Sequence, residues 1–176
     1  MFRLLHDGAS GAMGYLLADD DTAEAVLIDP RAGDVPALCA LLADQRLRLR
    51  WVLRTHEHDA MLPRESSALV LLGAPVVERR VPSPAGGRLQ FGSESVQVLA
   101  TPGHTAGCLS FAWRDRIFCG GLMAADSCPF QPWPAEPEAM WDSVQRHVFA
   151  VPDETLLFSG HSRTARVVST VKEQRY

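Results

Sequence analysis

Apolar and polar residues recur along this chain with two periods, one typical of strands and one typical of helices. Paired runs of alternating or continuous apolar residues, separated by turn residues, predict hairpins over residues 13–29, 88–103 and 108–120. Single strands are expected over 50–55 ("RWVLRT"), 74–78 ("APVVE") and 154–160 ("ETLLFSG"). Strands and helices therefore interleave along the chain, which predicts a mixed α/β (α+β) fold.

Helices are predicted where apolar residues recur at helical spacing between recognisable start and stop signals. The first helix follows Asp34 and has Pro36 in its first turn, and the second begins at Pro63 and stops at Gly73. A third helix is expected over 138–152, with Met140, Val144 and Val148 on its inner face, and a closing helix over 164–175. Residues 121–137 contain too much proline for regular structure.

Composition narrows the class of protein. The chain has 176 residues, 47% of them hydrophobic, which suits a single domain over residues 1–176 with a real core. Its net charge of −4 is spread along the chain, which argues against binding nucleic acid. The longest apolar run, over 68–77, is too short and too broken to cross a membrane, and no signal peptide is evident. Four cysteines without a CxxC pair favour a reducing compartment, so we expect a soluble cytoplasmic protein.

Four of the six histidines directly follow strand-like segments, where a rigid strand fixes the loop that comes next. His56 and His58 stand two apart in "THEHDA", His104 lies in the turn "TPGHTAG", and His161 lies in "FSGHS". Imidazole is a common ligand for zinc and also binds ferrous iron, and three imidazoles leave a coordination position for water or substrate. The sequence therefore predicts one metal ion, zinc or iron, held by His56, His58 and His104.

The segments "THEHDA", "TPGHTAGCLSF", "IFCGG" and "LLFSGHS" occur in an order and spacing that resemble the metallo-β-lactamase superfamily. The chain is most similar to the persulfide dioxygenase branch, with the glyoxalase II hydrolases as cousins. The opening hairpin "YLLADDDTAEAVLIDP" and the closing segment over 140–175 share this resemblance, so it covers nearly the whole chain. It implies a four-layer αββα sandwich, in which two sheets face each other and the site lies along one edge.

The same resemblance shows that half of the superfamily motif HxHxDH is missing. Its first two histidines are present, but its Asp falls on Ala60 and its last His on Met61. The Asp that ends the next metal-site strand falls on Gly121, within "CGG". One metal site therefore keeps three imidazoles and the second keeps only His161, which argues against a two-metal mechanism.

A comparison with the persulfide dioxygenases bears on the substrate. The resemblance implies that this branch holds a single ferrous ion with two of these histidines and the Asp that Gly121 replaces here. Cys128 matches a cysteine of the branch, but Phe130 stands where a substrate-binding Arg is expected. These differences argue against glutathione persulfide as the substrate.

Three hypotheses remain open for the reduced site. In the first, the three imidazoles form a mononuclear enzyme centre that hydrolyses or oxidises a small thiol derivative, a thioester or a persulfide. Glu57 and Asp59 would then orient the histidines or transfer protons, and His161 is a further catalytic candidate. In the second hypothesis the protein is a catalytically inactive, metal-free or metal-poor relative that binds a partner. A homodimer or a sulfurtransferase partner would fit either hypothesis.

The third hypothesis assigns a role to sulfur. Cys119 lies two residues before Gly121, and Cys128 lies in the loop beyond. A thiolate is a good ligand for soft metals and a good nucleophile, so either cysteine could replace the lost carboxylate or take part in sulfur transfer. Asp126 is a further candidate ligand from the same loop. Of the three, the sequence slightly favours the mononuclear metal protein.

Overall fold

Two β-sheets face each other in this chain. The computed structural model describes residues 1–56, 62–78, 87–123, 136–163 and 166–176. Within these residues the first sheet has five strands in the order β1-β2-β3-β4-β5: Phe2–His6, Met13–Asp19, Glu24–Ile28, Arg48–Leu53 and Val76–Val77. The second has six in the order β11-β10-β9-β8-β7-β6: Val168–Thr170, Leu156–Ser159, Arg116–Gly120, Leu109–Trp113, Glu94–Ala100 and Arg88–Phe91.

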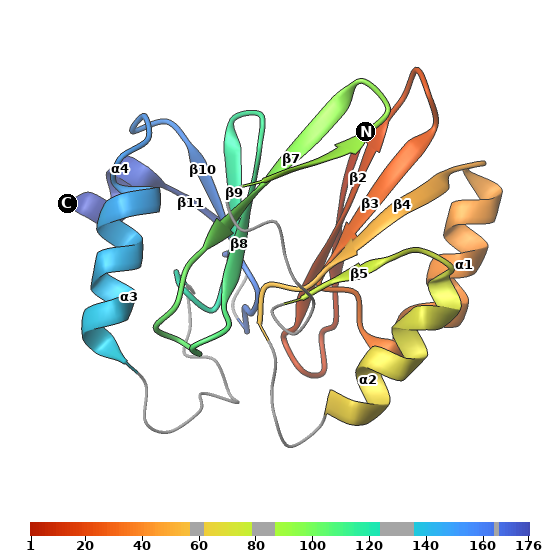
Figure 1. Cartoon of the computed structure of the whole chain (residues 1–176), viewed down its shortest axis with the longest axis horizontal. Helices are drawn as coiled ribbons and strands as arrows, with labels where there is room; N and C mark the ends of the chain where they lie inside the picture. The colour runs from red at the N-terminus through yellow and green to blue at the C-terminus, as the bar shows by residue number, and fades with distance from the viewer. Residues whose placement is uncertain (57–61, 79–86, 124–135, 164–165) are drawn as a thin grey trace.

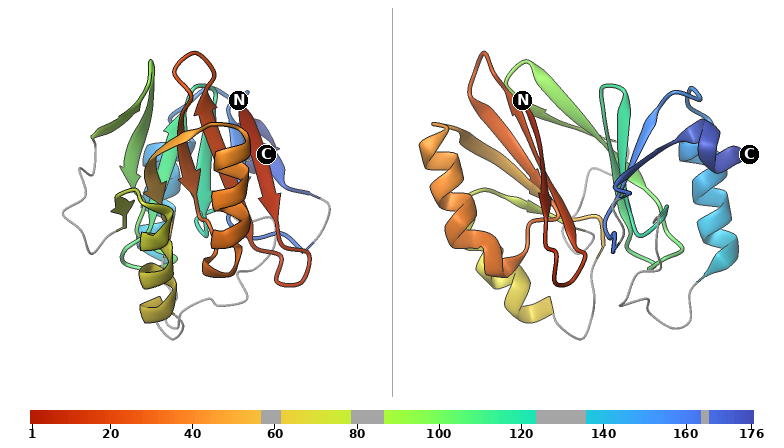
Figure 2. Two further views of the ribbon diagram at one scale, coloured as in Figure 1. Left: turned by 90° about the vertical axis from the view of Figure 1, so that its right-hand side faces the viewer. Right: turned by 180° about the vertical axis from the view of Figure 1, so that it is seen from behind.

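Helices cover the outer faces of both sheets (Figure 1). The first sheet carries α1 (Val35–Asp44), α2 (Leu62–Leu69) and two 3₁₀ turns, η1 (Ala32–Asp34) and η2 (Val70–Leu72). The second carries α3 (Pro137–Ser143), which continues as the π-helical turn η3 (Val144–Val148), and α4 (Val171–Arg175). The view from behind shows the same succession of layers (Figure 2). The αββα sandwich predicted from the sequence is confirmed.

Three apolar layers hold the four structural layers together. Strand β2 shows the principle, because all seven of its residues are buried. Tyr15 and Leu17 point between the sheets, where Phe118 and Phe158 pack against Tyr15. Leu16 points the other way, into the layer beneath α1 and α2. A strand buried on both faces reads as a continuous apolar run, which is why "MGYLLA" lacks the usual alternation.

The three predicted hairpins are confirmed, and β2–β3, β6–β7 and β8–β9 pair antiparallel. The closing helix over 164–175 is partly wrong, because residues 168–170 form the edge strand β11. The helix starts only after Thr170, whose side chain and that of Glu173 form a capping box. Strand β1 was not predicted, because "FRLLH" is short and its polar and apolar residues do not alternate regularly.

Parallel pairing brings particular strand ends to one edge of the sandwich. Strand β3 runs parallel to β4, and β9 runs parallel to β10. The carboxyl ends of these strands therefore point toward the same edge, which is the lower edge in Figure 1. Among the helices of the described residues, none is long and apolar enough to cross a lipid bilayer.

Candidate metal centre

Three histidines from different parts of the chain meet at this edge. His56 follows β4, His104 follows β7, and His161 follows β10. The ring centres of His56 and His104 lie 5.1 Å apart with the rings nearly perpendicular, and those of His56 and His161 lie 5.4 Å apart. His104 and His161 are buried. The structure therefore brings His56, His104 and His161 together at one edge of the sandwich.

Within this group the Nε2 atoms of His56 and His161 lie 3.2 Å apart. Two nitrogens bound to one tetrahedral zinc ion, each at about 2.0–2.1 Å, are separated by roughly 3.3 Å. The pair therefore has the spacing of two ligands of one ion. Within the described residues no three His, Cys, Asp or Glu side chains form a complete ligand group, and His58 lies outside those residues.

A half-buried carboxylate lies behind His56. Asp29 follows β3 and accepts hydrogen bonds from Thr55, one from the backbone N–H and one from the hydroxyl, both 2.7 Å long. The Thr55 hydroxyl oxygen also lies 2.7 Å from Nδ1 of His56. A chain of short contacts therefore runs from Asp29 through Thr55 to His56. Hydrogen bonds of this kind fix the tautomer and orientation of a metal-binding imidazole.

Two glycines at the end of β9 make room for this arrangement. Gly120 has a φ of +56°, and a Cβ on it would lie 2.2 Å from the hydroxyl oxygen of Thr55. The neighbouring Gly121 packs against the ring of His104 in the same way. Gly121 occupies the position where the superfamily resemblance implies a metal-binding carboxylate. The end of β9 therefore contributes no metal-binding side chain at these two positions, and the space beside it is filled by Thr55 and His104.

His104 has a sulfur atom as a neighbour. The Sγ atom of Cys108 lies 3.5 Å from Nδ1 of His104. Cys108 is itself buried, and the backbone N–H of Thr105 donates to its sulfur over 3.2 Å. The turn "HTAGC" therefore folds back so that its cysteine orients its histidine.

His161 is held by the first sheet as well as by its own strand. It forms an isolated bridge with Ala12, and the N–H of Met13 donates to the carbonyl of Gly160 over 2.9 Å. The Tyr15 hydroxyl donates to the carbonyl of Ser159 over 2.5 Å. Burial raises the pKa of the Tyr15 phenol, which keeps this donor protonated. These contacts leave the loop that carries His161 little freedom to move.

Burial sets the charges at this site. It lowers the pKa of both His104 and His161, and the nearby His104 lowers that of His161 further. Both imidazoles are therefore held in the neutral form, which is the form that binds metals. The pKa of Asp29 is raised to about 6, mainly by burial, against the opposing effect of the hydrogen bonds from Thr55. Asp29 is thus predominantly ionised at neutral pH.

The remaining candidates divide into those outside the described residues and those elsewhere in the fold. Eight residues named in the sequence analysis lie outside the described residues: Glu57, His58, Asp59, Ala60, Met61, Asp126, Cys128 and Phe130. Cys119 is buried in the apolar layer beneath α3, where it packs with Ile117 and Leu122 and its thiol points to the carbonyl of Ile117 over 3.6 Å. Burial raises its pKa to about 12. The structure therefore does not place Cys119 as a substitute for the lost carboxylate.

Asp29 and Thr55 are the residues that sequence reasoning did not single out. Flanking acids within "HEHD" were expected to orient the histidines, whereas His56 contacts the Thr55 hydroxyl, which in turn donates to Asp29 at the end of a neighbouring strand. The available signal was the acid in "VLIDP", placed directly after a buried strand. Because β3 and β4 are parallel neighbours, the residues that follow them meet at the same edge.

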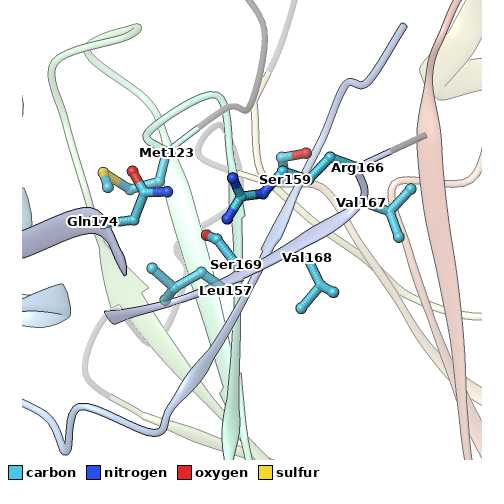
Figure 3. A pocket seen from close by; sticks show the side chains of 8 residues that line it. All are labelled: Met123, Leu157, Ser159, Arg166, Val167, Val168, Ser169 and Gln174. Carbon is cyan, nitrogen blue, oxygen red and sulfur yellow. The ribbon is translucent and has the colours of Figure 1, made fainter. Parts of the chain in front are cut away.

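A separate cavity of about 140 Å³ lies on the helix-facing side of β10 (Figure 3). The guanidinium of Arg166 points toward the middle of its lining residues, with Ser159, Ser169 and Gln174 around it. Arg166 also pairs with Glu173 over 2.7 Å. The cavity is therefore polar, and the charge that lines it is already paired.

Known proteins of similar sequence and structure agree with the fold. The mitochondrial persulfide dioxygenase ETHE1 of Bos taurus is 30% identical over 99% of this chain and 73% of its own length. A hydroxyacylglutathione hydrolase of Cereibacter sphaeroides is 33% identical over 97% of this chain and 67% of its own. The crystal structure of ETHE1 from Myxococcus xanthus superimposes with a TM-score of 0.85 at 30% identity, covering 99% of this chain and 81% of that one.

The chain matches no protein-family model. The alignment with the Bos taurus relative nevertheless covers 99% of the chain, and the superposition on the Myxococcus xanthus structure also covers 99%. The chain therefore belongs to the metallo-β-lactamase superfamily, in the branch that contains the persulfide dioxygenases and the glyoxalase II hydrolases.

Proposed function

We propose that this protein is a mononuclear metal-dependent enzyme of thiol metabolism, which hydrolyses or oxidises a small thiol derivative. The ligand set predicted from the sequence is His56, His58 and His104. The observation that carries the proposal is the convergence of His56 and His104, which come from different strand ends and lie with ring centres 5.1 Å apart. Similarity to a persulfide dioxygenase and a hydroxyacylglutathione hydrolase supports a persulfide or a thioester as the substrate class.

The chemistry of the donor set supports either metal. A zinc ion bound here would supply hydroxide near neutral pH, and a ferrous ion would supply a site for oxygen and a thiolate. The side chains around the site would orient the histidines and set their protonation. Asp29 and Thr55 orient His56, Cys108 orients His104, and burial keeps His104 neutral. With no carboxylate at Gly121, an anionic thiolate would provide the negative charge that the protein itself lacks.

Turnover assays test this proposal. Protein loaded with zinc should hydrolyse a glutathione or coenzyme A thioester, or protein loaded with ferrous iron should consume oxygen with a small persulfide. The His56→Ala variant should lose at least 100-fold in rate, whereas His147→Ala, on the far side of the second sheet, should not. Equal rates in both variants would show that any turnover arises elsewhere.

One observation favours a second candidate function, a non-catalytic binding protein. Gly121 leaves the end of β9 without the carboxylate that the superfamily resemblance implies, and the ring of His104 packs into the space. A scaffold of this kind would bind a small thiol, a second copy of the chain or a sulfurtransferase without chemistry. A metal-free protein that binds a thiol with no turnover would favour this candidate.

A further inference from the structure

We propose that His161 binds the same metal ion as His56, and that Asp29, acting through Thr55, holds His56 in the tautomer that this requires. The inference rests on the proposed metal site and goes further, because the superfamily resemblance assigns His161 to a second site whose other ligands have no counterpart in this sequence. In the structure the two imidazoles lie with their Nε2 atoms 3.2 Å apart. That separation suits adjacent ligands of one ion.

The tautomer of His56 follows from counting protons at Thr55. Ionised Asp29 has only acceptor atoms, so the single hydroxyl proton of Thr55 is donated to it. The Thr55 oxygen can then only accept from His56, whose Nδ1 must therefore carry the ring proton. The lone pair of His56 consequently sits on Nε2, the atom that faces His161.

The position of His161 is fixed independently of any metal. Its loop is tied to the start of β2 by the bridge to Ala12 and by the hydrogen bond from Ser162 to the carbonyl of Gly11, which is 2.8 Å long. Without metal, the short contact requires the Nε2–H of His161 to donate to Nε2 of His56. When an ion binds both nitrogens, the proton of His161 must move to Nδ1.

This change of tautomer gives a test that does not depend on activity. Protein labelled with ¹⁵N-histidine would be prepared without metal and titrated with zinc, and two-bond ¹H–¹⁵N spectra would show which ring nitrogen carries each proton. Variants His56→Gln and His161→Gln assign the signals. We expect His56 to keep its Nδ1 proton throughout, and His161 to change from the Nε2–H to the Nδ1–H form at one equivalent of zinc. The signals of His147 should not change.

Variants of Thr55 test the positioning role. Thr55→Val keeps the shape of the side chain but removes the hydroxyl, so His56 should become a mixture of tautomers and zinc affinity should fall about 10–100-fold. Thr55→Ser restores the hydroxyl and should restore both properties. A His56 tautomer that is the same in Thr55→Val as in the wild type would overturn the role of Asp29 and Thr55.

The outcomes separate this inference from the proposed function. Zinc that shifts the signals of His56 and His104 but leaves His161 in its metal-free tautomer would overturn the shared site and leave the proposed function standing. Zinc that shifts no histidine signal at all would overturn both. The His161→Gln variant provides a second measure, because its zinc affinity should fall at least 100-fold if His161 is a ligand.

Discussion

The imidazole of His104 lies against the backbone of Gly121, so closely that a Cβ on Gly121 would be 2.4 Å from its Nδ1 atom. Atoms of a side chain do not approach each other to this distance, so the place of a residue-121 side chain is already taken by His104. The glycine at position 121, where the superfamily resemblance implies a carboxylate, and the position of His104 are therefore linked. Reintroducing a side chain at 121 must displace a candidate metal ligand.

Gly121→Ala should for this reason lower both stability and metal affinity. We expect the free energy of unfolding to fall by about 2 kcal/mol, as is usual for an overpacked core, and zinc affinity to fall with it. Gly33→Ala is the matched control, because a Cβ there meets nothing within 4 Å and φ is not left-handed. Urea unfolding and zinc titration of both variants check the prediction. Two variants of equal stability would mean that His104 moves aside at no cost.

Asp29 should make stability depend on pH in an unusual direction. Its pKa is about 6 in the folded protein against a reference value of 3.8, so the folded state binds more protons than the unfolded state between these values. The stability that Asp29 contributes is therefore greatest in acid and declines as the pH rises from about 4 to 6, by about 3 kcal/mol in total. Asp29→Asn cannot titrate and lacks this decline.

The measurement is the difference in unfolding free energy between wild type and Asp29→Asn at several pH values. This difference should change between pH 4 and 6 and level off above pH 6, because Asp29 is then ionised in both states. A difference that stays constant from pH 4 to 8 would show that the pKa of Asp29 is not raised.

Arg54 should be a larger contributor to stability than the other arginine pairs. It is buried directly before the site and binds Glu78 at 3.2 Å and Glu65 at 3.3 Å, which joins β4 to β5 and α2. Arg54→Leu leaves acids without their partner and should cost about 3 kcal/mol in unfolding free energy. Arg48→Leu, which removes an exposed partner of Glu24, should cost less than about 1 kcal/mol. Thermal unfolding of the two variants checks the prediction. Equal losses of unfolding free energy in Arg54→Leu and Arg48→Leu would contradict it.

Cys119 should behave as a core residue rather than as a ligand or nucleophile. Its thiol is buried and has a pKa of about 12, whereas Cys39 on α1 is exposed. Iodoacetamide at pH 8 should therefore label the peptide that contains Cys39 in the native protein and leave the Cys119 peptide unlabelled. Cys119→Ala should keep the wild-type metal content. Rapid labelling of Cys119, or loss of metal from this variant, would restore it as a candidate for the site.

More of the fold than of the site could be predicted from the sequence. Strands β2 and β9 are evident because apolar runs end at turn residues, and the order of the histidine segments points to the superfamily. Strand β11 could not be predicted, because three residues at the edge of a sheet show no clear apolar pattern. In the sequence, the capping pair Thr170 and Glu173 also looks like the interior of a longer helix.

The partners of the histidines could not be read from the sequence for a different reason. Asp29 reaches Thr55, and through it His56, only because β3 and β4 are parallel neighbours, and such proximity depends on the folded sheet. Contact between His56 and His161 likewise depends on the loop of His161 being tied to the start of β2. The superfamily resemblance by itself implies separate metal sites for these two histidines.

Metal content per chain tests the central claim most directly. It would be measured by elemental analysis of protein purified without chelator or histidine tag, for the wild type and for His56→Ala, His104→Ala and His147→Ala. The account predicts about one zinc or iron ion per chain in the wild type and in His147→Ala, and much less than one in the other two variants. A wild type without metal, even after incubation with zinc and ferrous iron, would contradict it.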